Sequence, residues 1–385
     1  MTHVLMTYPG MIPSVLLCGQ MQFAYLAQLG KIEFRSISRD LLSAEDCGWA
    51  DVVVFVRSDS ELEAELAVKL KQAGKRLVYV MDDDLLCVPE SISSGPYYAR
   101  KEVKASIREM LSLCDVFMSP SETLRSKYGR EKVAVIEEPS SWQPEKAART
   151  GGPLRIGFAG SIDRAADFDV LLGAVVKSLL ACYNDKISIE FFGAHPQVAD
   201  ECDIRCIPYC DSYEAYQRTM ESLDWDIGLA PMPETTFHAC KHYNKFVEYA
   251  GLGIAGVYSN TVPYTRIVRN ETNGLLCNNT PVAWTAAISR LIEDDALRER
   301  IARDAQIQAK TQFSVEVTAL AMEKELGDIL THTAPNHTSI RISAWLRAKM
   351  LFCRGWRALG RYGLRLPAVA IQKLTKKIMK RDFSA

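Results

Sequence analysis

Short apolar strand-forming segments alternate with helix-length segments along most of this chain, and the alternation runs in two series. In the first series, the strand-forming segments are HVLMT, IEFRS, DVVVFV, RLVYVM, DVFMS and VAVIE. The segments between them show helical periodicity near residues 15–29, 61–73, 101–113 and 121–128. Apolar strands joined by helical crossovers indicate a parallel, doubly wound sheet.

A second series of the same kind follows a segment that has no apolar periodicity. That segment, EPSSWQPEKAARTGGP, is rich in Pro, Gly, Ser and charge, which is typical of a linker. The strands expected after it are LRIGFAG, ISIEFFG, IRCIPY, DIGLAP, IAGVYS and GLLC. We therefore predict an α/β protein with two Rossmann-like domains, residues 1–140 and 154–330, joined by a linker over 141–153. Ligands are expected in the cleft between the two sets of strand ends.

Charge and cysteine usage narrow the function classes. The chain of 385 residues has a formal net charge of -1, so we predict no nucleic-acid partner. The start MTHVLMTYPG has no basic region and no long apolar run, which predicts neither a secretory signal nor a membrane span there. The 11 cysteines are scattered, as is usual for reduced thiols. We expect a cytoplasmic protein.

The segment FHACKHYNKFVEYAGLG, residues 237–253, directly follows the apolar strand DIGLAP and carries charged side chains toward the cleft. A helix over 241–250 would place Lys241, Lys245 and Glu248 on one face, because these residues are three and four apart. Lysine can meet a phosphate, while glutamate accepts hydrogen bonds from sugar hydroxyls. The segment therefore predicts a nucleotide-sugar pocket; an ordinary solvated Lys/Glu helix is the alternative.

A glycine turn is predicted where the strand LRIGFAG runs into Gly160 and Ser161 ahead of a helix. Glycine lets backbone N–H groups approach a pyrophosphate closely, and the amino end of a helix favours negative charge. No P-loop signature G-x-x-x-x-G-K-[ST] occurs in the chain, which argues against a P-loop nucleotidase.

Taken in order, these motifs resemble the group-1 branch, also called family 4, of the glycosyltransferases with the GT-B fold. The resemblance covers residues 154–330 and is carried by IGFAGS, DIGLAPM, CKHYNKFVEYAGLG and VPYTRIVRNETNGLLC. It implies a nucleotide diphosphosugar donor, retention of anomeric configuration, a ribose contact from Glu248 and cationic stabilisation of the diphosphate. The donor-site residues that it implies are Gly160, Ser161, Lys241, Lys245, Glu248 and Asn273.

The chain departs from this family in two places. The family often carries an E-x7-E pair, but the position eight residues before Glu248 is Cys240, and Glu234 is our candidate for part of the missing role. The histidine that family members often use in the first domain has no match, because none occurs between His3 and His195. The reaction would then depend on positioning and on stabilisation of the leaving group.

Three consecutive carboxylates, Asp82, Asp83 and Asp84, follow the strand RLVYVM. Because crowded carboxylates repel, we predict a raised pKa for one of them, suited to proton exchange or to holding acceptor hydroxyls. Helix capping and turn formation are the alternative. Asp83 and Asp84, with Lys241 and Lys245, are our candidate catalytic residues. A D-x-D triplet also occurs in metal-dependent GT-A transferases, but two α/β halves argue against that fold, so we predict no essential metal and no cofactor.

The last segment, residues 331–385, is strongly basic. From residue 338 on it carries many Lys and Arg and a single acid, Asp382. At ~100° per residue its large apolar side chains lie opposite its arginines, as in helices that lie in a membrane interface. We predict contact with an anionic membrane; a helix packed on the body or a disordered tail is the alternative. The apolar stripe consists of Trp345, Phe352, Trp356 and Leu359.

Our leading functional hypothesis is a cytoplasmic glycosyltransferase in cell-surface polysaccharide synthesis, acting on a glycan or lipid-linked acceptor at the inner face of the membrane. A nucleotide-sugar epimerase or phosphorylase on the same two-domain plan is one alternative. A non-catalytic nucleotide-sugar-binding subunit is another, motivated by Cys240 and by the missing histidine.

Overall fold

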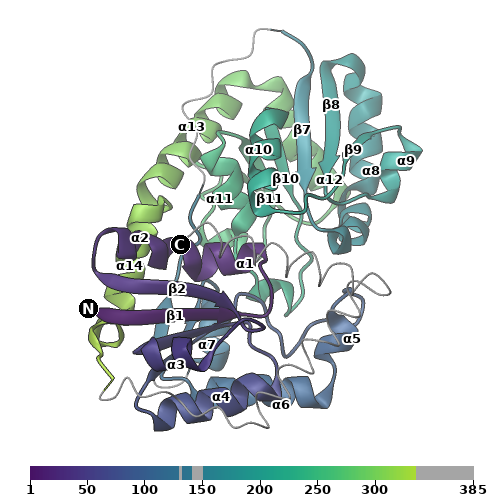
Figure 1. Cartoon of the computed structure of the whole chain (residues 1–385). Coiled ribbons are helices and arrows are strands. Elements are labelled where there is room, and N and C mark those ends of the chain that lie inside the picture. The colour runs from purple at the N-terminus through teal and green to yellow at the C-terminus, as the bar shows by residue number, and fades with distance from the viewer. Residues whose placement is uncertain (130–131, 141–150, 335–385) are drawn as a thin grey trace, which may run out of the picture.

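Two parallel six-stranded sheets form the two halves of the molecule in a computed structural model that describes residues 1–129, 132–140 and 151–334 (Figure 1). The strand order is β2-β1-β3-β4-β5-β6 in the first sheet and β12-β11-β10-β7-β8-β9 in the second. The paired Rossmann-like architecture predicted from the alternation of strands and helices is confirmed. The predicted amphipathic tail lies outside the described residues, and none of the described helices has the length and apolarity to cross a membrane.

All the strand segments predicted from the sequence form strands. Burial on both faces explains why inner strands such as β3 read as continuous apolar runs; every residue of β3 is buried. The first sheet contains β1 (Thr2–Tyr8), β2 (Ile32–Ser38), β3 (Val52–Val56), β4 (Arg76–Val80), β5 (Val116–Ser119) and β6 (Val133–Val135). The second contains β7 (Leu154–Ala159), β8 (Ile187–Phe192), β9 (Arg205–Ile207), β10 (Ile227–Ala230), β11 (Ala255–Ser259) and β12 (Leu275–Cys277).

The four helices predicted in the first half are present, one of them interrupted, and two short helices, α3 and α5, were not predicted. The helix expected over 15–29 is broken by a π-helical turn, Leu16–Gln20, in which Cys18 and Gly19 leave helical geometry. Gly19 has a φ of 152°, and a Cβ there would lie 3.3 Å from the side chain of Met6. The helices are α1 (Pro13–Val15), α2 (Met21–Gln28), α3 (Ala44–Trp49), α4 (Glu61–Gln72), α5 (Gly95–Tyr98), α6 (Lys101–Leu113) and α7 (Glu122–Tyr128).

The second half has longer helices, among them α8, which begins just after the Gly160-Ser161 turn. The glycine pattern GLGIAG at 251–256 matches that of dinucleotide-binding loops, but it ends a helix and starts β11, whereas that fingerprint follows a strand and opens a helix. The helices are α8 (Ala165–Tyr183), α9 (Gln197–Glu201), α10 (Tyr213–Leu223), α11 (Asn244–Gly251), α12 (Pro281–Glu293) and α13 (Asp295–Gln312).

After α13 the chain returns to the first half. The predicted end of the second domain at residue 330 is therefore too late. Helix α14 (Val315–Leu326) packs on α2, as the two ribbons show in Figure 1. Ala319, Met322 and Leu326 share one apolar core with Val4 and Met6 of β1. The apolar stripe of α14 indicates that the helix is covered, but a sequence pattern does not say by which sheet.

Replacing Met322 should therefore weaken the first domain rather than the second. Met322 is fully buried, so Met322→Ala should lower the free energy of unfolding by roughly 2–5 kcal/mol. Leu320→Ala is the matched control, because Leu320 lies on the same helix and is 38% exposed. Hydrogen exchange should quicken at the amides of β1 in the Met322 variant; faster exchange confined to β7 would contradict the packing.

Candidate functional site

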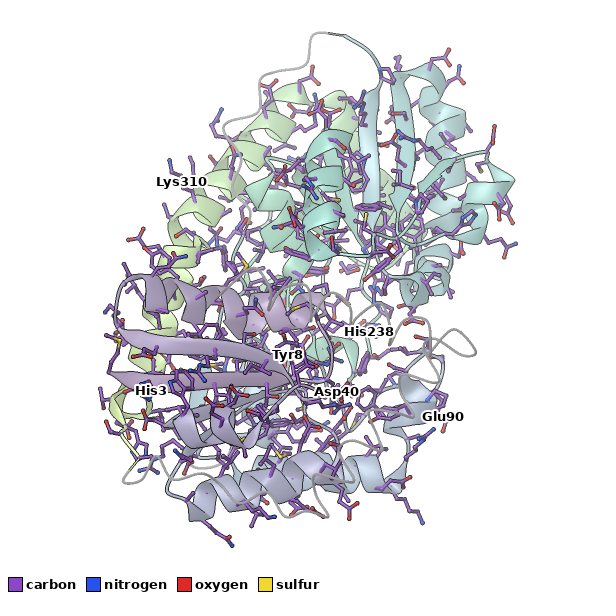
Figure 2. The ribbon with its side chains drawn as sticks, viewed as in Figure 1. His3, Tyr8, Asp40, Glu90, His238 and Lys310 are labelled. Atoms are coloured by element: carbon purple, nitrogen blue, oxygen red, sulfur yellow. The ribbon has the colours of Figure 1, made fainter. Side chains whose placement is uncertain are left out.

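The loops at the carboxyl ends of the strands in the two sheets face one another across the domain boundary. Each sheet reverses its strand order beside one strand, β1 in the first and β7 in the second, and ligands of open α/β sheets bind at such points. Asp163, after β7, accepts hydrogen bonds from the backbone N–H (3.0 Å) and hydroxyl (2.9 Å) of Ser93 in the first half. Figure 2 labels residues of both halves near this boundary: Tyr8, Asp40 and His238.

The segment 237–243 of the second half packs against the first half. The helix predicted over 241–250 is wrong at its start. Helix α11 begins at Asn244, while Lys241 is extended after a short 3-10 turn, His238–Cys240. Cys240 is buried in the apolar core of the first domain. His242 lies 3.2 Å from Glu137. Because these side chains reach into the first half, the chain cannot continue as one helix, and Lys241 does not share a helical face with Lys245.

Lys241 forms an ion pair across the domain boundary. Its ammonium lies 2.7 Å from the Asp83 carboxylate and 4.7 Å from the centre of the Phe237 ring. Arg57 lies 3.6 Å from the same carboxylate. Burial alone would raise the pKa of Asp83, but the positive charges of Lys241 and Arg57 outweigh it and lower the pKa to about 2. The predicted raised pKa is therefore wrong for Asp83.

Each of the three aspartates is paired with a cation, and Arg57 is shared by Asp82 and Asp83. Asp82 pairs with Arg57 at 3.2 Å. Asp84 is almost fully buried and accepts from the Lys127 ammonium and the Tyr128 hydroxyl, both at 2.7 Å. Asp84 is thus held inside the first domain, while Asp83 faces the domain boundary.

The amino end of α8 brings a second cation to this boundary. Gly160 and Ser161 form the turn that precedes it, and Ser161 is exposed. Arg164 donates to the carbonyl of Pro231 at 2.8 Å and lies 3.2 Å from Asp167 in the first turn of α8. The predicted turn and the helix after it are therefore in place, with backbone N–H groups and a guanidinium at one helix end.

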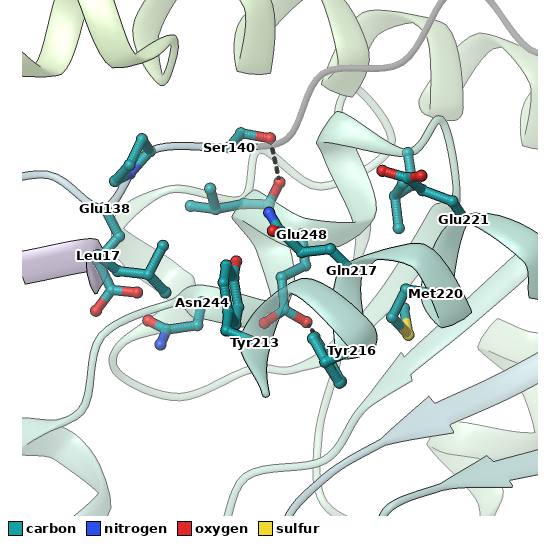
Figure 3. A pocket seen from close by; sticks show the side chains of 13 residues that line it. Leu17, Glu138, Ser140, Tyr213, Tyr216, Gln217, Met220, Glu221, Asn244 and Glu248 are labelled. Atoms are coloured by element: carbon teal, nitrogen blue, oxygen red, sulfur yellow. Dashed lines mark hydrogen bonds between the residues drawn. The ribbon is translucent and has the colours of Figure 1, made fainter. Parts of the chain in front are cut away.

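A cavity of about 430 Å³ lies between the halves and is lined by Leu17, by residues 138–140 and by α10 and α11 (Figure 3). Glu248 points into it from α11. Its Oε2 atom accepts from the Tyr216 hydroxyl at 2.7 Å and from Lys245 at 2.5 Å. Lys245 and Glu248 thus form an ion pair at this cavity.

A buried acid, Glu138, lines the same cavity and interacts with the other half. It accepts a hydrogen bond from the Cys18 thiol at 3.4 Å and lies 3.8 Å from the His242 ring. Burial raises the pKa of Glu138 to about 7, although the charge of His242 opposes the rise. Burial alone would lower the pKa of His242, but Glu138 and Glu137 raise it above its usual value.

Two predicted donor-site residues lie apart from these contacts. Asn273 is buried, accepts from the Arg269 backbone at 2.6 Å and donates to the Ile267 carbonyl at 3.0 Å and to Gln308 at 2.7 Å. These contacts brace its own loop against α13. Glu234 is exposed in the loop after β10. Their proposed contacts to a donor remain predictions.

Three charged residues of this boundary were not predicted from the sequence: Arg57, Glu138 and Arg164. Arg57 and Arg164 each lie close behind the end of a predicted strand, β3 and β7, and that position was an available signal. Glu138 was read as the start of a linker, and no local pattern distinguishes it from an exposed acid. Its burial depends on Cys18 and His242, which are distant in sequence.

No protein-family model matches the chain, and no curated protein matches its sequence. Solved structures do resemble it. Sucrose-phosphate synthase from Thermosynechococcus elongatus has a TM-score of 0.63 at 12% identity, over 86% of this chain and 100% of that chain. HepE from Anabaena in complex with UDP-glucose has a TM-score of 0.58 at 14% identity, over 85% and 100%.

Two further neighbours show how widely the architecture is used. TarM has a TM-score of 0.50 at 12% identity; the match covers 80% of this chain but 57% of TarM. A putative UDP-N-acetylglucosamine 2-epimerase from Listeria monocytogenes has a TM-score of 0.56 at 10% identity, over 87% and 99%. At such identities the similarity establishes architecture. The chain has the GT-B fold, with two Rossmann-like domains that face one another.

The buried pair of Glu138 and His242 predicts that the free energy of unfolding falls as pH rises. The folded chain binds the Glu138 proton more tightly than the unfolded chain, so ionisation between pH 5 and 8 should cost up to about 3 kcal/mol. The raised pKa of His242 acts in the same direction.

Urea unfolding at pH 5 and pH 8 measures this fall in the free energy of unfolding. Glu138→Gln should remove most of it. Glu214→Gln, at an exposed position, should keep it, and equal falls in both variants would contradict the assignment.

Proposed function

We propose that the chain is a glycosyltransferase that takes a nucleotide diphosphosugar as donor. The observation that carries the proposal is the cavity between the domains, where the Glu248 carboxylate is oriented by Tyr216 and Lys245. A carboxylate held in this way can accept hydrogen bonds from two ribose hydroxyls. HepE, which has the same fold, is solved with UDP-glucose, and this supports the class of donor.

The diphosphate is proposed to lie at the amino end of α8, between Gly160, Ser161, Arg164 and Lys241. Backbone N–H groups at a helix end and two cations suit the charge that develops as the diphosphate leaves. Lys241 is paired with Asp83. A diphosphate carries more negative charge than one carboxylate, so it can replace Asp83 as the partner of Lys241.

The acceptor hydroxyl is proposed to approach from the first domain, beside Asp83. With its pKa near 2, Asp83 is ionised at neutral pH, so its role is to orient an acceptor hydroxyl and to hold Lys241. Asp84 would act through packing, because Lys127 and Tyr128 already satisfy it. We assign the chain to the group-1 branch, with retention of configuration, no essential metal, and a role in cell-surface polysaccharide synthesis, on the resemblance of its motifs.

Two alternative functions are each favoured by a specific observation. An epimerase acting on the nucleotide sugar alone is favoured by the Listeria neighbour, a putative UDP-N-acetylglucosamine 2-epimerase with the same fold. A non-catalytic nucleotide-sugar-binding subunit is favoured by Cys240, which stands where the family often has glutamate and is buried in the first domain. Turnover assays with and without acceptors separate the three.

Glu248→Gln should weaken donor binding, because one hydrogen bond to a charged group is lost. We expect an affinity lower by roughly 10- to 100-fold. Isothermal titration with UDP-, GDP-, dTDP- and CMP-sugars measures it, and the preferred donor is then tested for turnover on glycan and lipid-linked acceptors. Glu221→Gln, at the rim of the same cavity, is the matched control and should bind normally. Unchanged affinity in the Glu248 variant would refute the donor assignment.

We also propose that the basic segment after residue 334 holds the enzyme at an anionic membrane near a lipid-linked acceptor. Its charge supports this: residues 338–385 contain a single acid, Asp382. Deleting the chain after Asn336 should release the protein from vesicles that contain phosphatidylserine, while donor affinity is unchanged. Sedimentation with vesicles at low and high salt measures this, and persistent binding of the truncated protein would refute the proposal.

A further inference from the structure

The Asp83 carboxylate is held by two cations that contact different oxygen atoms. The Lys241 ammonium, which comes from the second domain, lies 2.7 Å from Oδ1. The Arg57 guanidinium, which comes from the first domain, lies 3.6 Å from Oδ2. A ligand that draws Lys241 away would therefore free Oδ1 for a new hydrogen bond, while Oδ2 would keep its cation.

Arg57 is anchored within the first domain. Its Nη1 atom donates to both carboxylate oxygens of Asp82 at 3.2 Å and to the Ser14 hydroxyl at 3.3 Å. Burial alone would lower the pKa of Arg57, but the carboxylates of Asp82 and Asp83 raise it, so the guanidinium stays charged. Its partners among the described residues, Ser14, Tyr98 and the two aspartates, all belong to the first domain. Arg57 therefore stays beside Asp83 whatever the second domain does.

The backbone of Arg57 adopts a conformation that is unusual for arginine. Its φ is 51°, in the left-handed region, where a residue with a Cβ is strained. Arg57 directly follows β3, and its N–H donates to the Val80 carbonyl of β4 at 2.9 Å. The strained residue thus lies at the edge of the sheet from which Asp82 and Asp83 follow. Such strain is concentrated at functional sites, which favours a role beyond packing.

We propose that Arg57 is a positioning residue that keeps the Asp83 carboxylate ionised and in place when the donor draws Lys241 away. The freed Oδ1 atom of Asp83 then accepts a hydrogen bond from the acceptor hydroxyl, while Arg57 holds Oδ2. The inference rests on the proposed function, in which the diphosphate of the donor replaces Asp83 as the partner of Lys241.

A carboxylate at this boundary needs a cation to stay ionised. Burial alone would raise the pKa of Asp83. The charges of Lys241, Arg57 and, more weakly, Arg164 lower it to about 2. Glu138 shows the opposite case: it is buried without an arginine or lysine partner among the described residues, and its pKa is raised to about 7. Because the proposed diphosphate takes both Lys241 and Arg164, Arg57 is the cation that remains for Asp83.

A purely structural role, in which Arg57 only neutralises buried carboxylates, is the alternative. Arg39 offers a matched control, because its guanidinium also pairs with two carboxylates of the first domain, Asp59 at 2.8 Å and Glu63 at 2.6 Å. The side chains of Arg39 and Arg57 are 14% and 15% exposed. Replacing either arginine removes one buried positive charge, but only the change at Arg57 should alter the titration of Asp83.

The titration of Asp83 is measured by ¹³C NMR on the full chain labelled at its aspartate carboxyls, with the signal assigned through Asp83→Asn. The Lys241→Met background imitates the withdrawn lysine, so no donor is required. Adding Arg57→Met should raise the titration midpoint by at least about two pH units, because burial is then opposed by Arg164 alone. Arg57→Lys should restore most of the low midpoint, and Arg39→Met should leave it unchanged.

An unchanged midpoint in the Arg57→Met variant, or an equal rise in the Arg39→Met variant, would overturn the assignment. If the variant that lacks both cations does not fold, adding Asp82→Asn removes one of its two uncompensated acids, and the same rise is expected in that variant.

The role in acceptor positioning is tested by the pH dependence of kcat/KM for the acceptor at saturating donor. In Arg57→Met this quantity should fall about tenfold per pH unit below the raised midpoint, because one group must be ionised. Arg39→Met should keep the wild-type profile. Failure of the wild-type chain to bind any sugar nucleotide would refute the proposed function. Normal donor affinity with a wild-type profile in Arg57→Met would instead overturn the role of Arg57.

Discussion

The ion pair between Lys241 and Asp83 is the interaction on which the arrangement of the site depends. It joins the loop after β10 of one sheet to the loop after β4 of the other. Both side chains are 24% exposed, so water screens the pair in part. A pair of this kind can hold two domains in register and still yield to a ligand with more charge.

The neighbouring contacts are built on the same segment. Cys240 enters the core of the first domain on one side of Lys241, and His242 reaches Glu137 and Glu138 on the other. The second half thus contributes a strip of three consecutive side chains to the first. This docking also closes the cavity that Glu248 lines, because Glu138 forms one of its walls.

The strands and most helices were predictable from the sequence, because buried parallel strands read as apolar runs and the helices between them keep their period. Local pattern also predicted the turn at Gly160 and Ser161 and the shared helical face of Lys245 and Glu248. What local pattern could not supply was pairing over long sequence distance. The lowered pKa of Asp83 depends on Lys241, and the start of α11 depends on Cys240 and His242 docking elsewhere. Helix α14 packs on the first domain, from which the whole second sheet separates it in sequence.

The central claim is that a nucleotide diphosphosugar lies between the domains with its diphosphate against Lys241 and the amino end of α8. The most direct measurement is a crystal structure of the full chain soaked with the donor that it binds most tightly. The account predicts density for the diphosphate beside Gly160 and Arg164, with the Lys241 ammonium moved from Asp83 to a phosphate oxygen and the ribose on Glu248. An empty boundary between the domains, or a donor bound elsewhere with the Lys241–Asp83 pair intact, would contradict it.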